Sequence, residues 1–179
     1  IRKAARFWIM KLPHMLFVID VVEAEEPVGL CSHFVGNNRN NELKVHIYNP
    51  HRLVFRRGEE ALKLFEIYSE TDGRVSDTNL EFDWTYVHDY YHPLPNQAGQ
   101  GKEGSGLTYL WKSAEEGKKQ IRIHSLAMER EADIKKWHVR TRDDGFIRIE
   151  SPDPAEYLDV KTTGDEIVIR QPGRGADRI

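Results

Sequence analysis

Two histidines four residues apart have the residue type and the spacing that are most similar, in this chain, to those of a metal site. His88 and His92 flank the sequence Asp-Tyr-Tyr. On a helix this spacing places both imidazoles on one face, as in zinc hydrolases, and Asp83 or His124 would supply further ligands. Pro93 follows His92 directly, however, and a residue before proline is biased away from helical geometry. An aromatic-rich strand is therefore the alternative structure of this segment. A metal-dependent enzyme using His88 and His92 is the third of the three functions that the sequence suggests.

Other catalytic motifs are weak or absent. Residues 99–104 have the letters of a phosphate-binding Gly-x-Gly-x-x-Gly loop, but no strand closely precedes them and no helix is predicted after them. Gly104-Ser105-Gly106 lacks the strand-turn-helix context of a nucleophile elbow. The single cysteine, Cys31, follows the sequence Val-Gly-Leu, so we expect a small buried residue rather than a nucleophile. These patterns favour a non-enzymatic protein without a cofactor.

The elements that must position any site are predicted to be β-strands. Apolar and polar residues alternate over short segments separated by polar turns, which is the period of half-buried strands. The predicted strands are residues 7–10, 16–22, 43–48, 53–55, 64–68, 82–87, 107–111, 121–124, 137–140, 146–149, 157–160 and 167–170. Residues 126–136 have a helix-forming composition and are predicted as either a short helix or a loop.

Three turn sequences and one long break separate these strands. Residues 71–73, 143–145 and 163–165 contain Gly and Asp, which tolerate positive φ in tight hairpins. Residues 93–106 are rich in Gly and Pro, and we interpret them as a large surface loop. The chain has 179 residues, and domains commonly run about 100–200 residues. We therefore predict a single domain over 1–179.

Two parts of the chain repeat the same spacing of strand and turn residues. Residues 65–67 followed by Asp72-Gly73 match residues 137–139 followed by Asp144-Gly145. Hairpins that recur with unequal insertions suit a closed barrel with internal pseudo-symmetry. We therefore predict an all-β protein with a β-trefoil-like barrel of paired hairpins. A two-sheet β-sandwich is the alternative that the hairpin pattern permits equally well.

The residues around these repeats resemble the ricin-type β-trefoil family, whose fold is shared by fascin-like proteins and fungal protease inhibitors. In that family a tryptophan ends one subdomain, a polar turn and a short strand follow, and a Leu-Asp-Val-like strand begins the next. Trp137 and residues 157–160 are similar to that order, and residues 18–21 are similar to another subdomain start. The family's Gln-x-Trp signature stands here as Lys135-x-Trp137.

The resemblance implies a carbohydrate-binding, lectin-like module. It places Asp20 as the carboxylate that accepts hydrogen bonds from sugar hydroxyls, Phe34 as the stacking aromatic and Asn41 as the polar amide. Asp159 would mark a second site of the same kind. Concave sugar sites need these residue types. In the alternative interpretation Asp20 begins a hairpin, Phe34 is a core residue and residues 37–41 are a polar turn.

Composition restricts the class of partner. The formal net charge is −3 and basic pairs such as Arg56-Arg57 have acidic neighbours, so we expect no nucleic-acid partner. The apolar run at 15–19 has strand length, far short of a membrane span. One cysteine excludes an internal disulfide, which predicts a cytoplasmic protein or one exported without disulfides. The predicted partner is a glycan or, for an interaction or protease-inhibitor module of the same fold, a protein.

Overall fold

The computed structural model describes residues 1–11, 15–38, 42–83, 105–128, 137–151, 153, 155–163 and 166–178. The chain forms two compact units, Ile1–Glu131 and Ala132–Ile179, where the sequence predicts one domain. Each unit has its own sheets. A Gly- and Pro-rich loop is predicted at 93–106. Residues 93–104 of this loop lie outside the described residues, and residues 105 and 106 begin a strand.

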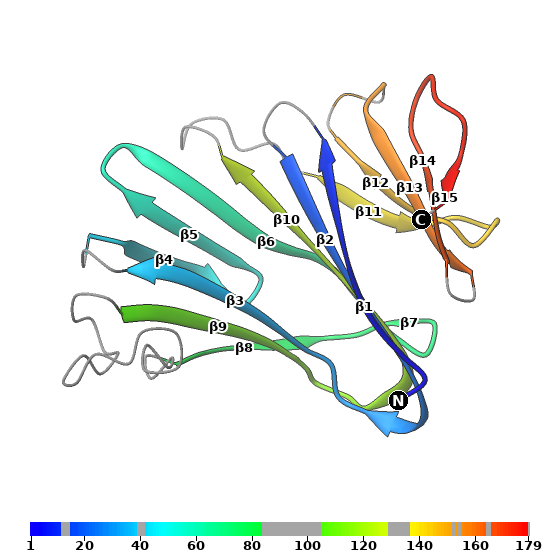
Figure 1. Ribbon diagram of the computed structural model, residues 1–179, viewed down its shortest axis with the longest axis horizontal. Helices are drawn as coiled ribbons and strands as arrows, with labels where there is room; N and C mark the ends of the chain where they lie inside the picture. The colour runs from blue at the N-terminus through cyan, green and yellow to red at the C-terminus, as the bar shows by residue number, and fades with distance from the viewer. Residues whose placement is uncertain are drawn as a thin grey trace. The chain divides into compact units, whose positions relative to one another are not determined.

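The described part of the first unit consists of antiparallel strands. They are β1 (Lys3–Lys11), β2 (Met15–Val28), β3 (Cys31–Asn38), β4 (Lys44–Asn49), β5 (Arg52–Arg57), β6 (Glu60–Thr71), β7 (Arg74–Val75), β8 (Thr78–Asp83), β9 (Ser105–Ser113) and β10 (Gly117–Met128). A seven-stranded sheet has the order β1-β2-β10-β6-β5-β4, with β7 beside β6, and a three-stranded sheet has the order β3-β9-β8 (Figure 1).

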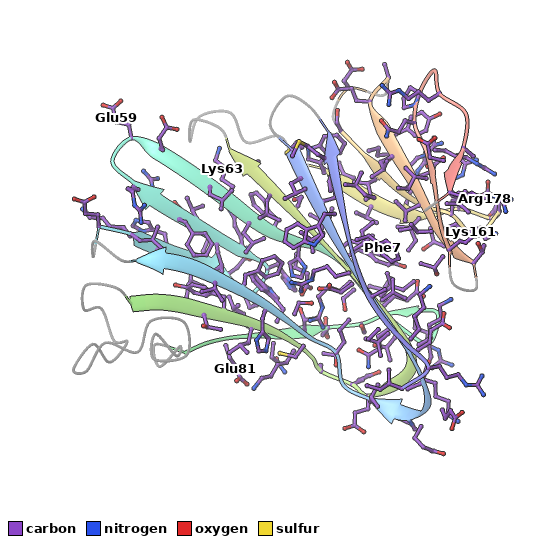
Figure 2. The ribbon with its side chains drawn as sticks, in the orientation of Figure 1. Phe7, Glu59, Lys63, Glu81, Lys161 and Arg178 are labelled. Atoms are coloured by element: carbon purple, nitrogen blue, oxygen red, sulfur yellow. The ribbon has the colours of Figure 1, made fainter. Side chains whose placement is uncertain are left out.

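The two sheets of the first unit share one apolar core. Val18, Leu53 and Leu64 come from the seven-stranded sheet, and Phe34 and Trp111 come from the three-stranded sheet. The rings of Phe34 and Trp111 meet edge to face, with centroids 5.6 Å apart. Figure 2 shows side chains between the sheets. Two sheets that bury their facing sides together form a sandwich-like arrangement.

The all-β prediction is confirmed for the described residues, but none of their sheets closes into a barrel, and the β-trefoil is not confirmed. The strands at the ends of the seven-stranded sheet are β1 and β4, which do not pair with each other. In a barrel of paired hairpins, strands that are neighbours in the chain lie side by side. Instead β10 lies between β2 and β6, so strands far apart in the chain form the centre of the sheet.

An irregularity in the pairing of β6 with β10 decides which polar residues enter the interior. The register shifts between Ile123 and His124, so that His124 lies opposite Glu66 whereas Arg122 lies opposite Ser69. Opposed residues of an antiparallel pair project to the same face, and a bulge moves later residues to the other face. Glu66 and Ser69, three residues apart within β6, therefore both contribute polar side chains to the face of the sheet on which Arg122 and His124 lie.

The second unit is a five-stranded antiparallel sheet in chain order. Its strands are β11 (His138–Thr141), β12 (Ile147–Glu150), β13 (Tyr157–Thr163), β14 (Glu166–Arg170) and β15 (Asp177–Arg178). Burial alternates along β12, where Ile147 and Ile149 are buried, whereas three consecutive residues are buried in each of β13 and β14. The predicted strands of this part are confirmed, because each pairs antiparallel with its neighbour in the chain.

The turn predictions are confirmed where the structure describes them. Asp72 and Gly73 have φ of 50° and 81°, and Gly145 has φ of 76°. Residues 164 and 165 of the third turn lie outside the described residues. The segment predicted as a short helix or a loop begins as strand, since β10 continues to Met128, and residues 129–136 are not described. Within the described residues, no helix has the length and apolar character to cross a membrane.

Replacing Gly73 by Ala should destabilise the first unit. Positive φ at Asp72 and Gly73 closes the hairpin between β6 and β7, and a Cβ in the left-handed region costs about 1–2 kcal/mol. The measurement is urea unfolding followed by circular dichroism. Gly29→Ala is the matched control, because its Cβ would make only ordinary contact with Ser113 Oγ at 3.6 Å. Equal stability of the two variants would contradict the turn assignment.

Candidate ligand-binding cavity

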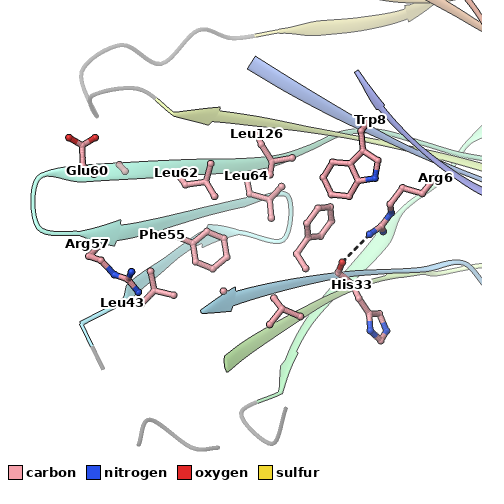
Figure 3. Close-up of a pocket in the computed structure, with 14 residues that line it drawn as sticks. Arg6, Trp8, His33, Leu43, Phe55, Arg57, Glu60, Leu62, Leu64 and Leu126 are labelled. Atoms are coloured by element: carbon pink, nitrogen blue, oxygen red, sulfur yellow. Dashed lines mark hydrogen bonds between the residues drawn. The ribbon is translucent and has the colours of Figure 1, made fainter. Parts of the chain in front are cut away.

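A cavity of about 480 Å³ lies between the two sheets of the first unit (Figure 3). Most of its wall is apolar. Phe55 of β5, Leu62 and Leu64 of β6, and Leu126 of β10 come from the seven-stranded sheet, and Phe34 comes from β3. Alternate residues of a strand project to one face, so these side chains reach the cavity from rigid neighbouring strands.

Charged residues lie at the two ends of this cavity. Arg6 and Trp8 of β1 are at one end, and Arg57 and Glu60 are at the other (Figure 3). Arg6 Nη1 donates a hydrogen bond of 3.4 Å to the carbonyl oxygen of His33 on β3. This bond joins the edge strand of one sheet to the edge strand of the other.

Asp20, the predicted sugar-binding carboxylate, lies in a buried hydrogen-bonded cluster. Arg6 donates from Nε to Oδ1 at 2.6 Å and from Nη2 to Oδ2 at 2.8 Å. Ser32 of β3 donates to Oδ2 at 2.6 Å. Asp20 is only 5% exposed, and its hydrogen bond raises the pKa of Arg6. Both carboxylate oxygens are thus occupied by groups of the chain itself.

The other predicted binding residues lie in different places. Phe34 is buried and lines the cavity, and its ring centroid lies 5.4 Å from the guanidinium carbon of Arg6. Because Arg6 is also the partner of Asp20, the structure brings Phe34 and Asp20 to the same end of the cavity. Asn41 lies outside the described residues. Asp159 belongs to the second unit, where Arg148 holds both its oxygens at 2.6 and 2.7 Å.

The predicted metal ligands are not assembled in the described residues. His88 and His92 lie outside them, and nothing is described of the side chain of Asp83. His124 is buried in the first unit. Among the described residues, no group of three or more His, Cys, Asp or Glu side chains is arranged to hold a metal ion.

The sequence predicts Cys31 to be buried, but its side chain is exposed on β3. The prediction was wrong because β3 was not recognised as a strand. The next residue, Ser32, projects into the interior instead. Partial burial raises the pKa of the Cys31 thiol, with Lys112 acting in the opposite direction. The thiol is therefore not activated as a nucleophile.

A second polar cluster, which the sequence does not reveal, lies around Arg122. This side chain is fully buried, and its Nη1 donates to the carbonyl oxygen of Trp111. Its Nε lies 3.6 Å from Glu66 Oε2, an ion-pair distance too long for a hydrogen bond. Thr78 of β8 donates to the Glu66 carboxylate at 2.6 Å, and burial lowers the pKa of Arg122. The cluster joins the two sheets through charged groups.

His124 lies beside Arg122 on the same face of β10, and its side chain is fully buried. Its ring packs against Phe34 at 4.6 Å and Trp111 at 4.9 Å between centroids. Neither Nδ1 nor Nε2 has a hydrogen-bond partner among the described residues. Burial, followed by the charges of Arg122 and Arg6, lowers the pKa of His124 well below its ordinary value. The imidazole is therefore neutral at neutral pH.

The sequence contains a signal for the buried polar side chains of β10, but this signal has two interpretations. Gln120, Arg122 and His124 alternate with Ile121 and Ile123, which reads equally as a strand with a solvent-exposed polar face. The structure buries both faces of this segment.

Comparison with known proteins adds no family to these observations. No family model matches the chain, and no curated protein matches its sequence. The assignment of a function therefore depends on the geometry of the described residues.

Arg6→Ala should destabilise the first unit by about 3 kcal/mol, because it leaves the buried Asp20 carboxylate without its main partner. The Arg6 side chain is 31% exposed, which places the expected loss at the lower end of the range for buried pairs. Arg2→Ala is the control, since its partner Glu25 is exposed and such pairs contribute about 0–1 kcal/mol. Similar unfolding midpoints in urea for the two variants would show that the Asp20 cluster does not stabilise the fold.

His124 should make folding stability depend on pH. In the unfolded chain the ring takes up a proton below its ordinary pKa of about 6.5, whereas the folded ring stays neutral to a lower pH. The unfolded state then binds more protons, so stability falls as the pH is lowered. Between about pH 7.5 and about pH 5.5 the wild type should lose about 1 kcal/mol relative to His124→Leu.

The measurement is urea unfolding of both proteins across this pH range. His46→Leu is the control, because it makes the same substitution at an exposed position on β4. A stability difference between wild type and His124→Leu that stays constant with pH would show that His124 takes up a proton equally in the folded and unfolded states.

Proposed function

We propose that the first unit is a non-enzymatic binding module that holds a small, mainly apolar molecule between its two sheets. The observation that carries this proposal is the cavity of about 480 Å³ with walls from Phe34, Phe55, Leu62, Leu64 and Leu126. Ligand sites typically have volumes of about 300–1,000 Å³, with apolar and aromatic walls and few polar groups. The cavity fits this description in size and in chemistry.

The physical gain from binding would come from apolar surface removed from water. That gain amounts to about 25 cal/mol per Å² of apolar area buried. The walls come from paired strands, so their backbone needs little ordering when a ligand enters. Arg6 already has Asp20 as its partner, and this pairing leaves the apolar wall as the main source of affinity.

A carbohydrate ligand has support only from the resemblance to the β-trefoil lectins. Phe34 keeps the aromatic character that the sugar hypothesis requires, but it lies in an apolar wall. The oxygens of Asp20 are occupied by Arg6 and Ser32, so they offer little to sugar hydroxyls. The geometry therefore favours an apolar ligand, and a saccharide becomes an outcome of the test.

The wild-type protein should bind N-phenylnaphthylamine, an uncharged probe whose fluorescence rises in apolar surroundings. Leu126→Trp should weaken probe binding at least about tenfold, because the indole ring occupies space in the cavity wall. Leu80→Trp is the matched control: Leu80 packs against the same core but does not line the cavity. Circular dichroism checks that both variants are folded.

Absence of probe binding to the wild type, or equal weakening by both tryptophan variants, would contradict the proposal. A glycan array with the same proteins completes the experiment. Saccharide binding that Leu126→Trp leaves intact, together with no binding of the apolar probe, would replace the apolar ligand by the lectin hypothesis.

A further inference from the structure

His124 lies directly behind the wall of the cavity. It is two residues from Leu126 on the same face of β10, and Leu126 lines the cavity. Phe34 also lines the cavity, and its ring contacts that of His124 with centroids 4.6 Å apart. The Phe34 ring is thus in contact with both the cavity and the imidazole.

His124 has hydrogen-bonding capacity that the described residues do not use. Its side chain is fully buried, and neither ring nitrogen has a partner among them. Arg122 Nε and Nη2, on the same face of β10, also lack a hydrogen-bond partner among the described residues, although Nε lies 3.6 Å from Glu66 Oε2. A buried polar group without a partner destabilises the fold, and a neutral imidazole can donate one hydrogen bond and accept another. These atoms are therefore suited to a polar atom that arrives with a ligand.

The charges around His124 are already balanced by one another. Arg6 is paired with Asp20, and Arg122 lies at ion-pair distance from Glu66. A ligand carboxylate would add an uncompensated negative charge to this buried region, because the His124 ring is neutral. An uncharged oxygen would satisfy the unpaired donors without that cost.

We propose that His124 is the polar anchor of the cavity, and that the ligand class is an apolar molecule carrying one uncharged hydroxyl or carbonyl group. The inference rests on the proposed function, since it concerns the same cavity. The apolar body of the ligand occupies the space between Phe55, Leu62 and Leu126. The proposal requires the Phe34 side chain to turn aside when the ligand binds, because its ring contacts both the cavity and the imidazole. Phe34 is on β3, which pairs on one side only, with β9, among the described strands.

Naphthalene, naphthol and naphthoate test this inference, because they share an apolar body and differ only in the polar group. Each compound is titrated against the bound N-phenylnaphthylamine probe at neutral pH, in the wild type, His124→Leu and the control His46→Leu. The ratio of naphthol affinity to naphthalene affinity should be about tenfold higher in the wild type than in His124→Leu. His46→Leu should keep the wild-type ratio, since His46 is exposed and does not line the cavity.

The outcomes separate this inference from the function on which it rests. If the probe does not bind the wild type, the proposed function fails. If the probe and naphthalene bind but the naphthol ratio is the same in wild type and His124→Leu, only the anchor is overturned. If naphthoate binds the wild type most tightly, the ligand class is an anion and the inference is overturned.

A second measurement decides the inference if His124→Leu does not fold. The ring-nitrogen resonances of the wild-type histidines are followed by NMR during titration with naphthol and with naphthalene. Naphthol should shift the His124 nitrogens more than naphthalene does and leave those of His46 unchanged. Equal shifts with the two compounds would show that no hydrogen bond to His124 forms.

Discussion

Asp20 joins the two sheets of the first unit through buried hydrogen bonds. Its carboxylate on β2 accepts from Arg6 on β1 and from Ser32 on β3. Arg6 in turn donates to the carbonyl oxygen of His33 on β3. A buried carboxylate is tolerated only when such partners compensate for its lost hydration. The position of β3 against the seven-stranded sheet therefore depends on this cluster.

A second group of buried charges in the first unit is also compensated by partners from both sheets. Arg122 and Glu66 form a second pair of opposite charges, and Thr78 on β8 donates to Glu66. Both sheets thus contribute to each cluster, and each charge has an opposite neighbour. The cavity lies in the other part of the interior, where apolar side chains such as Phe55 and Leu62 line the region between the sheets. The interior of the first unit is divided in this way into a polar part and an apolar part, with His124 where the two meet.

The candidate site was predictable in part. The resemblance to lectins indicates Phe34 as a sugar-stacking aromatic, and in the structure Phe34 lies in the apolar wall of the cavity. The same resemblance indicates Asp20 as a ligand contact, whereas in the structure its oxygens accept hydrogen bonds from Arg6 and Ser32. The sequence indicates His124 only as an additional metal ligand. The surroundings of each of these side chains consist of residues that lie far away in the sequence. No local sequence pattern therefore reveals these surroundings.

The sequence by itself determined most of the strands, although not β3, and the turns that the structure describes. Alternation of apolar and polar residues is a local property, and positive φ at Asp72 and Gly73 follows from their residue types. Only the tertiary structure decided how the strands pair, since β2 and β6 meet through β10, which comes much later in the chain. It also decided that the polar face of β10 is buried. A period of two residues assigns side chains to two faces, but which face meets water depends on the sheet that packs against it.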